Sequence, residues 1–179
     1  MVTNLASLIK IIGCVIVFAG CTAMGLTLSN KLIERQRTLT KLIDILINLK
    51  NQMCKLGIPL FLAFENIGMD KGAGMWSEVL LDCGNIIKTQ HIDTGKAWRI
   101  AIDKNKELLT LEASDWNVIS EFGEMLGKSD RQNQESILEL AKENLEKLET
   151  EARESVKTKG KLYRNMGVLS GAAVVILLI

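Results

Sequence analysis

The apolar residues in the first third of the chain repeat at spacings of three and four residues. Six of them follow one another at intervals of 3, 4, 3, 4 and 3 residues, the seam of a coiled coil: Leu39, Leu42, Leu46, Leu49, Met53 and Leu56. We therefore expect one helix over residues 31–55. Gly57 ends this helix, and Pro59 suits the first turn of the next one, where a fixed φ and a missing N–H cost little.

A second apolar stripe runs along the last third of the chain. Its members are spaced 4, 3, 4 and 4 residues apart: Ala141, Leu145, Leu148, Ala152 and Val156. Ser129 and Gln132 form a capping box at the start of this segment, which predicts a helix of about thirty residues. Each long helix has one end at an apolar terminal stretch, so we expect the two to lie antiparallel with their seams in contact.

Shorter helical patterns fill the region between the two long helices. They cover residues 59–67, 73–90, 94–106 from a Thr94 cap, and 114–126 from a Ser114 cap, and no segment favours a strand. Trp76, Trp98 and Trp116 are expected to form the core of this region. The pattern predicts an all-α fold.

Both ends of the chain are apolar enough to enter a membrane. Residues 11–28 are uncharged and would span about 27 Å as a helix. Residues 166–179 are shorter, about 21 Å, but Tyr163 and Arg164 before them suit a membrane interface. We expect two terminal transmembrane helices, with only the final carboxylate crossing at the C-terminal end.

Charge sets the expected topology. One base, Lys10, precedes the first apolar stretch and four bases follow within residues 31–41, while residues 153–164 carry five bases against Glu154. Lysine and arginine collect on the cytoplasmic side of membrane helices, so the centre should be cytoplasmic. Residues 42–152 hold 12 basic and 19 acidic residues, a net charge of −7 that favours a basic protein partner over nucleic acid.

An alternative topology rests on the FAGC stretch at residues 18–21. It resembles a lipoprotein processing box, after which Cys21 would become a lipidated N-terminus and the rest of the chain would be an exported scaffold. Phe18 stands where such boxes usually carry an aliphatic residue, and the apolar run continues for seven residues beyond Cys21.

These patterns give an expected domain organisation. Residues 1–29 form an N-terminal transmembrane segment, residues 30–164 a cytoplasmic helical domain, and residues 165–179 a C-terminal transmembrane segment. Within the domain, residues 31–56 and 130–163 form an antiparallel, coiled-coil-like stalk and residues 58–128 a small helical head. Gly167 and Gly171 form a GxxxG pair that favours helix packing in the membrane, with plain lipid exposure as the alternative.

Little in the sequence points to catalysis. His91 is the only histidine, no GxSxG or P-loop motif is present, and Cys54, Cys83 and His91 lack metal-ligand spacing. We expect no catalytic, cofactor or metal site, and interpret Cys54 and Cys83 as buried thiols.

The densest stretch is EFGEMLGKSDRQNQ at residues 121–134. Gly123 permits close helix packing, Gly127 is expected to end one helix in a left-handed conformation, and Ser129 or Asp130 to cap the next. The prediction is a tight corner between head and stalk that is also a candidate partner contact, formed by Leu126, Gly127, Asp130, Arg131 and Gln134.

Three stretches together resemble the stage III sporulation protein AB family of endospore-forming bacteria over nearly the full length. They are GIPL at residues 57–60, LGKSDRQNQ at residues 126–134 and MGVLSGAAVVILLI at residues 166–179. The resemblance implies a mother-cell membrane protein around the forespore, whose cytoplasmic domain is similar to the F-type platform of type II secretion and type IV pilus systems.

The same resemblance implies partners. They are a cytosolic motor ATPase, sporulation protein AA, other membrane proteins of the channel between mother cell and forespore, and the lipid bilayer; self-association stays open. The family brings no catalytic residues. We therefore expect a non-enzymatic platform or coupling component of that channel.

Overall fold

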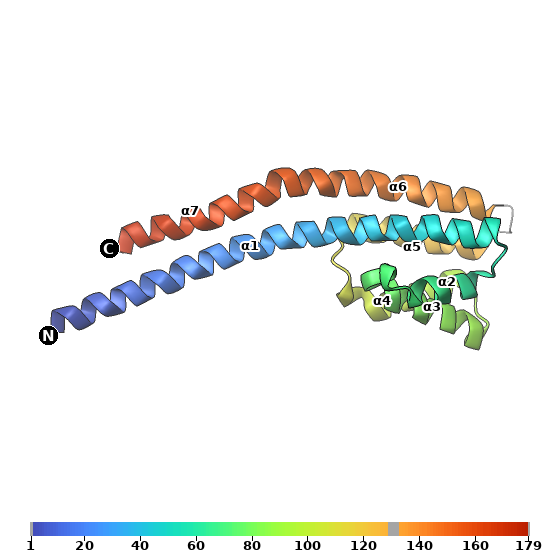
Figure 1. Cartoon of the computed structure of the whole chain (residues 1–179), viewed down its shortest axis with the longest axis horizontal. Coiled ribbons are helices and arrows are strands. Elements are labelled where there is room, and N and C mark those ends of the chain that lie inside the picture. Colours follow the sequence, from blue (N-terminus) through green and yellow to red (C-terminus); the bar gives the residue numbers. More distant parts are fainter. Residues whose placement is uncertain (1, 129–132, 179) are drawn as a thin grey trace. The chain divides into compact units, whose positions relative to one another are not determined.

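The computed structural model describes residues 2–128 and 133–178, and these residues form helices and short connections without a strand (Figure 1). The expected all-α class is confirmed. Three helices are long: α1 (Val2–Lys50), α6 (Gln134–Ser155) and α7 (Lys161–Leu178). Four are shorter: α2 (Leu60–Met69), α3 (Ser77–Gln90), α4 (Thr94–Asn105) and α5 (Ala113–Lys128). Two π turns and two 3₁₀ turns connect them: η1 (Asn51–Lys55), η4 (Val156–Gly160), η2 (Lys71–Trp76) and η3 (Lys106–Leu108).

The chain divides into two compact units. Unit 1 combines residues 1–34 with residues 152–179, and unit 2 is Arg35–Glu151. Helix α1 contributes to both units without interruption.

In unit 2 the two long helices run antiparallel. Lys50, at the end of α1, pairs with Glu135 and Glu139 in the first turns of α6, at 3.1 and 2.9 Å. Earlier in α1, Gln36 donates a hydrogen bond of 3.0 Å to Glu149 late in α6. The shorter helices pack in chain order, α2 on α3, α3 on α4 and α4 on α5.

An aromatic cluster forms the centre of unit 2. The ring of Trp98 stacks on Phe64 and Trp76, with ring centroids 5.8 and 6.5 Å apart, and meets Phe122 edge-on at 5.5 Å. Each buried indole N–H has an acceptor, since Trp98 donates to Ile119 O and Trp76 to Thr38 O, both at 3.0 Å. The bond from Trp76 ties the cluster to α1.

The expected seam of α1 is buried except at its last position. Leu39, Leu42, Leu46, Leu49 and Met53 are at most 5% exposed, but Leu56 is 71% exposed, so its assignment to the core is wrong. The α-helix ends at Lys50, and the π turn η1 then takes more residues per turn. Gly57, at φ 69°, redirects the chain immediately afterwards. The three-four spacing no longer describes the direction of side chains beyond Met53.

Several local expectations need correction. The expected helix 73–90 is a 3₁₀ turn and then α3, because Gly74 at φ 58° breaks the helical path. Helix α4 is capped by Asp93, which accepts from Gly95 N, instead of by Thr94. Trp76 and Trp98 are core residues, but Trp116 is only half-buried and lies under the ammonium group of Lys106.

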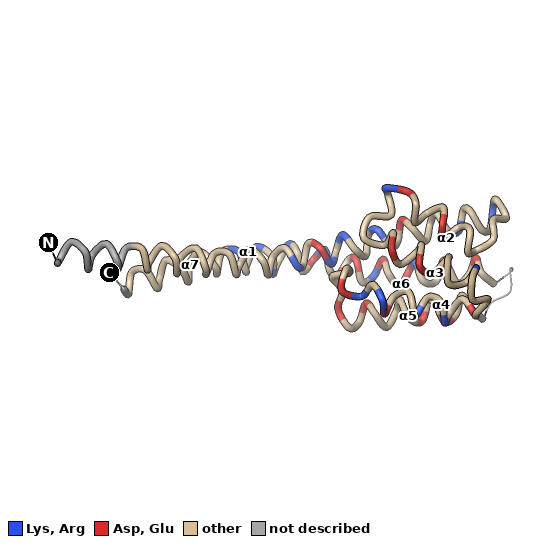
Figure 2. The backbone as a smooth tube through the Cα atoms, turned by 90° about the horizontal axis from the view of Figure 1, so that it is seen from below, with Lys and Arg blue, Asp and Glu red and all other residues tan. Residues whose placement is uncertain are grey.

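In unit 1, small residues let α1 and α7 approach closely. A Cβ placed on Gly25 would lie 2.6 Å from Tyr163 O, and one on Gly167 would lie 2.9 Å from Cys21 O and 3.0 Å from Gly25 Cα. Nothing larger than hydrogen fits at either position. The described parts of both helices beyond the basic residues carry no charge (Figure 2).

The π turn η4 keeps the buried positions of unit 1 on one side. Ala152, Gly160, Gly167 and Gly171 are buried, at steps of eight, seven and four residues. Eight residues of α-helix would overshoot two full turns by about 80°. The wider turn of Val156–Gly160 takes up most of this excess.

Among the described residues, one helix is long and apolar enough to cross a membrane. It begins at Ile12 of α1, and its most apolar window has a mean hydropathy of 1.9. Helix α7 does not meet the same criterion within the described residues. The second transmembrane segment therefore stays a prediction.

Candidate functional site

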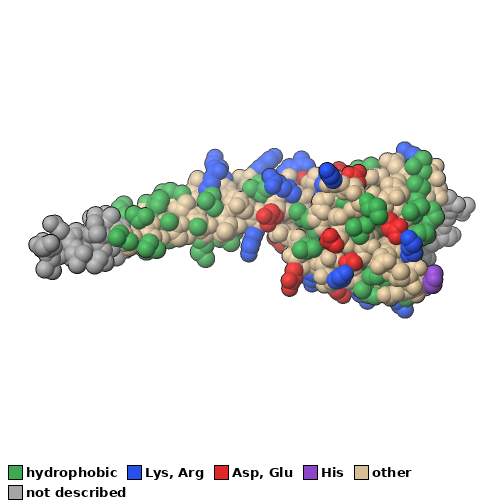
Figure 3. Space-filling model, turned by 60° about the horizontal axis from the view of Figure 1, so that its bottom comes forward, with side chains coloured by type: hydrophobic (Ala, Val, Ile, Leu, Met, Phe, Trp, Pro, Cys, Tyr) green, Lys and Arg blue, Asp and Glu red, His purple; other side chains and the backbone are tan. Residues whose placement is uncertain are grey.

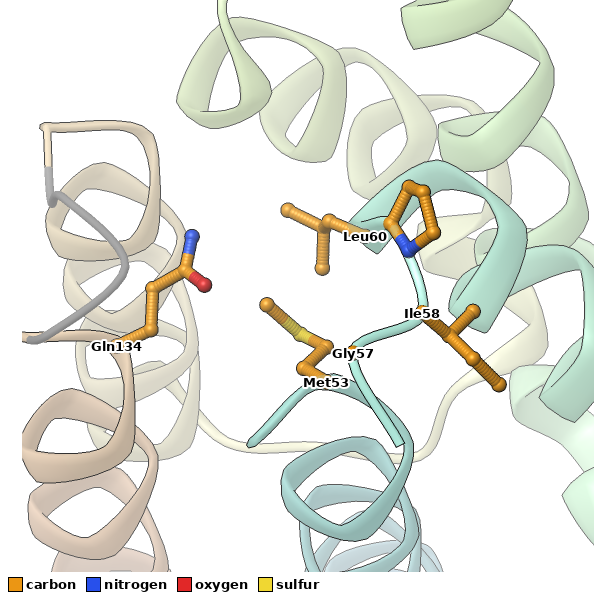
Figure 4. Close-up of a pocket in the computed structure, with 6 residues that line it drawn as sticks. Met53, Gly57, Ile58, Leu60 and Gln134 are labelled. Carbon is orange, nitrogen blue, oxygen red and sulfur yellow. The ribbon is translucent and has the colours of Figure 1, made fainter. Parts of the chain in front are cut away.

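A depression opens in unit 2 where α1 ends and α6 begins (Figure 4). It holds about 260 Å³ and is lined by Met53, Gly57, Ile58, Pro59, Leu60 and Gln134. The side chains of Met53, Leu60 and Gln134 converge on it, whereas Ile58 points away. The left-handed Gly57 and the extended Pro59 create this hollow, because they carry the chain away from α1 before α2 starts. The site is thus mostly apolar with one amide at its edge.

The predicted corner residues do not share one location in the structure. Gln134 lines the depression as the first residue of α6, and Leu126 is 2% exposed in α5. Helix α5 continues through Gly127 to Lys128, so the expectation that Gly127 ends the helix is wrong. Asp130 and Arg131, together with the Ser129–Gln132 capping box, lie outside the described residues.

Charged side chains next to the depression fasten α1 to α6. Lys50 donates to Glu139 and reaches Glu135, and Lys142 also binds Glu139, at 3.2 Å. The hydrogen bonds to Glu139 and Glu135 raise the pKa of Lys50 above its ordinary value. Those from Lys50 and Lys142 lower the pKa of Glu139. These shifts favour the charged forms of Lys50 and Glu139.

A buried ion pair joins α1 to the start of α5. The guanidinium of Arg35 donates two hydrogen bonds of 2.7 Å to the carboxylate of Asp115, and Glu112 lies 3.3 Å away at the surface. Asp115 also accepts from Glu112 N at 2.8 Å. The side chains of Arg35 and Asp115 are 8% and 0% exposed. Hydrogen bonding to Asp115 raises the pKa of Arg35 above its ordinary value.

Sequence reasoning missed this pair. We assigned Arg35 to the basic stretch beside the membrane because Lys31, Arg37 and Lys41 surround it. The available signal was its spacing, since Arg35 precedes Leu39 and Leu42 by four and seven residues and so continues the buried seam. A charge on a buried seam requires a partner of opposite charge.

The residues considered for chemistry are dispersed. Cys83 is buried, and burial raises the pKa of its thiol to about 12. Cys54 is exposed, so its assignment as a buried thiol is wrong; it lies in η1, where the side-chain register changes. His91 is an exposed residue at φ 50° after α3. Within the described part of the chain, no three His, Cys, Asp or Glu side chains gather as metal ligands would.

The glycines predicted for helix packing face α1 within unit 1. Gly167 lies against Gly25 and Cys21, and a Cβ on Gly171 would lie 3.0 Å from the ring of Phe18. The GxxxG pair is therefore occupied by contacts inside the chain.

The fold and these sites define a class: an all-helical protein with an apolar N-terminal helix and a tryptophan-centred helical unit. A family model, stage III sporulation protein AB, matches residues 10–179. The chain belongs to this family.

Two individual comparisons agree with the family. Stage III sporulation protein AB of Bacillus subtilis (strain 168) is 27% identical over 172 residues, which cover 96% of this chain and 99% of that protein. A solved structure of stage III sporulation protein AB has a TM-score of 0.61 and 25% identity, and covers 69% of this chain and 97% of the other. The resemblance drawn from the sequence is thereby confirmed, and it supports a role in sporulation.

Proposed function

We propose that the chain is a non-enzymatic membrane platform that couples a cytosolic motor ATPase, similar to sporulation protein AA, to the channel between mother cell and forespore. The observation that carries the proposal is the course of α1. One uninterrupted helix of 49 residues contributes an apolar segment to unit 1 and the buried Arg35, Thr38 and Leu39 to unit 2. A displacement imposed on unit 2 acts directly on the helix that enters the bilayer.

The proposal places both terminal helices in the mother-cell membrane and unit 2 in the cytoplasm. Apolar side chains on the outer surface of α7 support this for the C-terminal end, since Leu162, Met166 and Leu169 are 53%, 56% and 68% exposed. Exposing such an apolar surface to water is unfavourable, whereas contact with lipid acyl chains is favourable. The bases that follow the apolar part of α1 and precede that of α7 in the sequence agree with the cytoplasmic preference of Lys and Arg.

The depression at the end of α1 is the surface we assign to the ATPase. It is lined mainly by apolar groups, and Leu56, beside it in sequence, is 71% exposed. Apolar side chains with this much solvent exposure are often found at surfaces that bind a partner protein. The net charge of −7 over residues 42–152 would attract a basic face of the ATPase over a longer range.

Binding of the purified ATPase to the full chain in detergent tests this assignment. Leu56→Asp should weaken binding about ten-fold or more, because a charge replaces an apolar contact. Leu108→Asp is the matched control, since Leu108 is also well exposed, at 55%, but lies in η3. Equal affinity of both variants and the original chain would rule out this contact surface.

The topology has its own test. Cys54 is exposed in unit 2, so a membrane-impermeant maleimide should label it in inside-out vesicles and not in intact cells. The alternative, an exported scaffold lipidated at Cys21, predicts the reverse and a mature chain lacking residues 1–20. Cleavage before Cys21 would also remove Phe18, which lies against Gly171 of α7.

A further inference from the structure

Unit 1 carries a group of positive charges that it does not neutralise. Five bases are exposed at its charged end: Lys31 of α1, Lys157 and Lys159 of η4, and Lys161 and Arg164 of α7. We call them the basic collar. Unit 1 contains only two acidic residues, Glu34 and Glu154. No ion pair joins a collar residue to another described side chain.

Some bases of unit 2 pair with a carboxylate, as Lys50, Lys88, Arg99 and Lys104 do, whereas no ion pair joins Lys55, Lys71 or Lys96 to another described side chain. The collar is distinguished by its local excess of positive charge. It places five exposed bases in a unit that holds two acidic residues.

The collar residues lie at one level along the helices. Lys157 and Arg164 are seven residues apart, a rise of about 10 Å. Ser29 lies opposite Gly160, which brings Lys31 of α1 to the same level. The polar layer on each side of a bilayer is roughly 5–8 Å thick, and long side chains reach beyond their backbone. All five bases can thus contact one headgroup layer.

The surroundings of the collar favour lipid over a protein partner. Figure 3 shows Lys and Arg side chains projecting from both edges of the segment that α1 and α7 form, directly beside its apolar stretch. A folded protein would approach from one side, whereas headgroups surround a membrane helix. Phosphodiester groups accept hydrogen bonds from lysine and arginine, and basic segments next to membrane helices are attracted to anionic leaflets.

An apolar groove in unit 1 is suited to the acyl chains of a phospholipid. It holds about 370 Å³ between α1 and α7 and is lined only by Cys14, Val15, Phe18, Ala172, Val175 and Ile176. Ala172 is eight residues beyond Arg164, about 12 Å along α7. A lipid with its phosphate on the collar has its acyl chains beside this groove.

We propose that the basic collar binds the headgroups of anionic phospholipids, with an acyl chain in the groove between α1 and α7. The proposal rests on the membrane insertion stated under Proposed function. The chain would then carry bound anionic lipid out of a mixed bilayer.

The test uses the full chain in nanodiscs of mixed phosphatidylglycerol and phosphatidylcholine. After mild detergent extraction, mass spectrometry gives the ratio of anionic to zwitterionic lipid retained. We expect enrichment of phosphatidylglycerol over the bulk ratio. A triple variant, K157Q/K159Q/K161Q, should reduce this enrichment at least about five-fold, the effect expected for the loss of even one base. Raised salt should reduce it as well.

Two control variants isolate the collar. K157R/K159R/K161R keeps the charges and should keep the enrichment. K55Q/K71Q/K96Q removes three exposed lysines of unit 2 and should leave it unchanged. No enrichment in the original chain, or the same loss in both glutamine variants, overturns the proposal. Loss of spore yield in K157Q/K159Q/K161Q without any lipid enrichment in the original chain would instead indicate an acidic protein partner.

The experiments distinguish a failure of the lipid-binding proposal from a failure of the proposed function. If the original chain resists carbonate extraction and Cys54 is labelled only from the cytoplasmic side, but no lipid is enriched, the collar alone is refuted. If carbonate releases the chain from membranes, membrane insertion is refuted and the collar with it.

Discussion

The buried pair between Arg35 and Asp115 gives the sharpest stability prediction. Asp115→Ala would leave the guanidinium of Arg35 buried without the partner of its two hydrogen bonds; Glu112, which approaches to 3.3 Å, is itself 59% exposed. Removing one partner of a buried ion pair costs about 3–5 kcal/mol. The lost hydrogen bond from Glu112 N costs about 1 kcal/mol more. We expect a total loss of roughly 4–6 kcal/mol in the free energy of unfolding of unit 2.

A double variant separates the pair from simple loss of packing. Arg35→Met alone leaves Asp115 as an unpaired buried carboxylate, and its cost should also be about 3–5 kcal/mol. With both changes present no uncompensated charge remains, so the combined loss should fall short of the sum by about 2 kcal/mol or more. The exposed pair of Lys41 and Asp44, 3.7 Å apart, is the control, and Asp44→Ala should cost less than about 1 kcal/mol.

Urea unfolding of the full chain in detergent measures these changes. Trp76 and Trp98 are at most 1% exposed in the aromatic cluster, so their fluorescence reports unfolding of unit 2. A loss below 1 kcal/mol for Asp115→Ala, or strictly additive effects in the double variant, would refute the assignment of this pair as the fastening between α1 and α5.

Three further predictions follow from individual contacts. Gly123→Ala should destabilise unit 2 by at least about 2 kcal/mol in the same assay, because the new Cβ would lie 2.7 Å from Cγ of the stacked Trp98 ring. Gly25→Val should separate α1 from α7 and expose that interface to protease, whereas Gly20→Val, with nothing within 4 Å, should not. At pH 8 maleimide should modify Cys54 and spare Cys83, since a pKa of about 12 leaves roughly one thiolate in ten thousand; equal labelling of the two would contradict the burial of Cys83.

The three-four spacing of apolar residues correctly predicted buried positions where the backbone is a regular α-helix. Leu39, Leu42, Leu46 and Leu49 follow an α-helical seam and are buried. The same rule failed at Leu56, which follows a π turn that no spacing rule predicts. The interpretation of Cys54 as a buried thiol came from its residue type and is wrong at a position within that turn. Spacing places Arg35 on the same seam but could not identify its partner, because Asp115 lies 80 residues away and only tertiary structure brings the two together.

The candidate site was predictable only in outline. The sequence predicted a corner from its glycine and capping residues; of these, Gln134 lines the depression, whereas Gly127 continues α5. Its other walls come from residues 53–60, whose placement depends on the left-handed Gly57. Gly57 was expected to end the helix, but the path that residues 57–60 then take is not specified by any local spacing rule.

The π turn of η4 makes the effect of a length change depend on where it falls. Deleting one residue of VKTKG would let the segment close as ordinary α-helix, and the step from Ala152 to the following glycine would become seven residues, within about 20° of two full turns. Gly167 would then keep its place against Gly25. A deletion between Lys161 and Met166, where no wide turn can absorb it, would instead rotate everything after it by about 100° and remove Gly167 from that contact. Evolution should therefore accept the loss of one residue within VKTKG more readily than a loss in the helix that follows it.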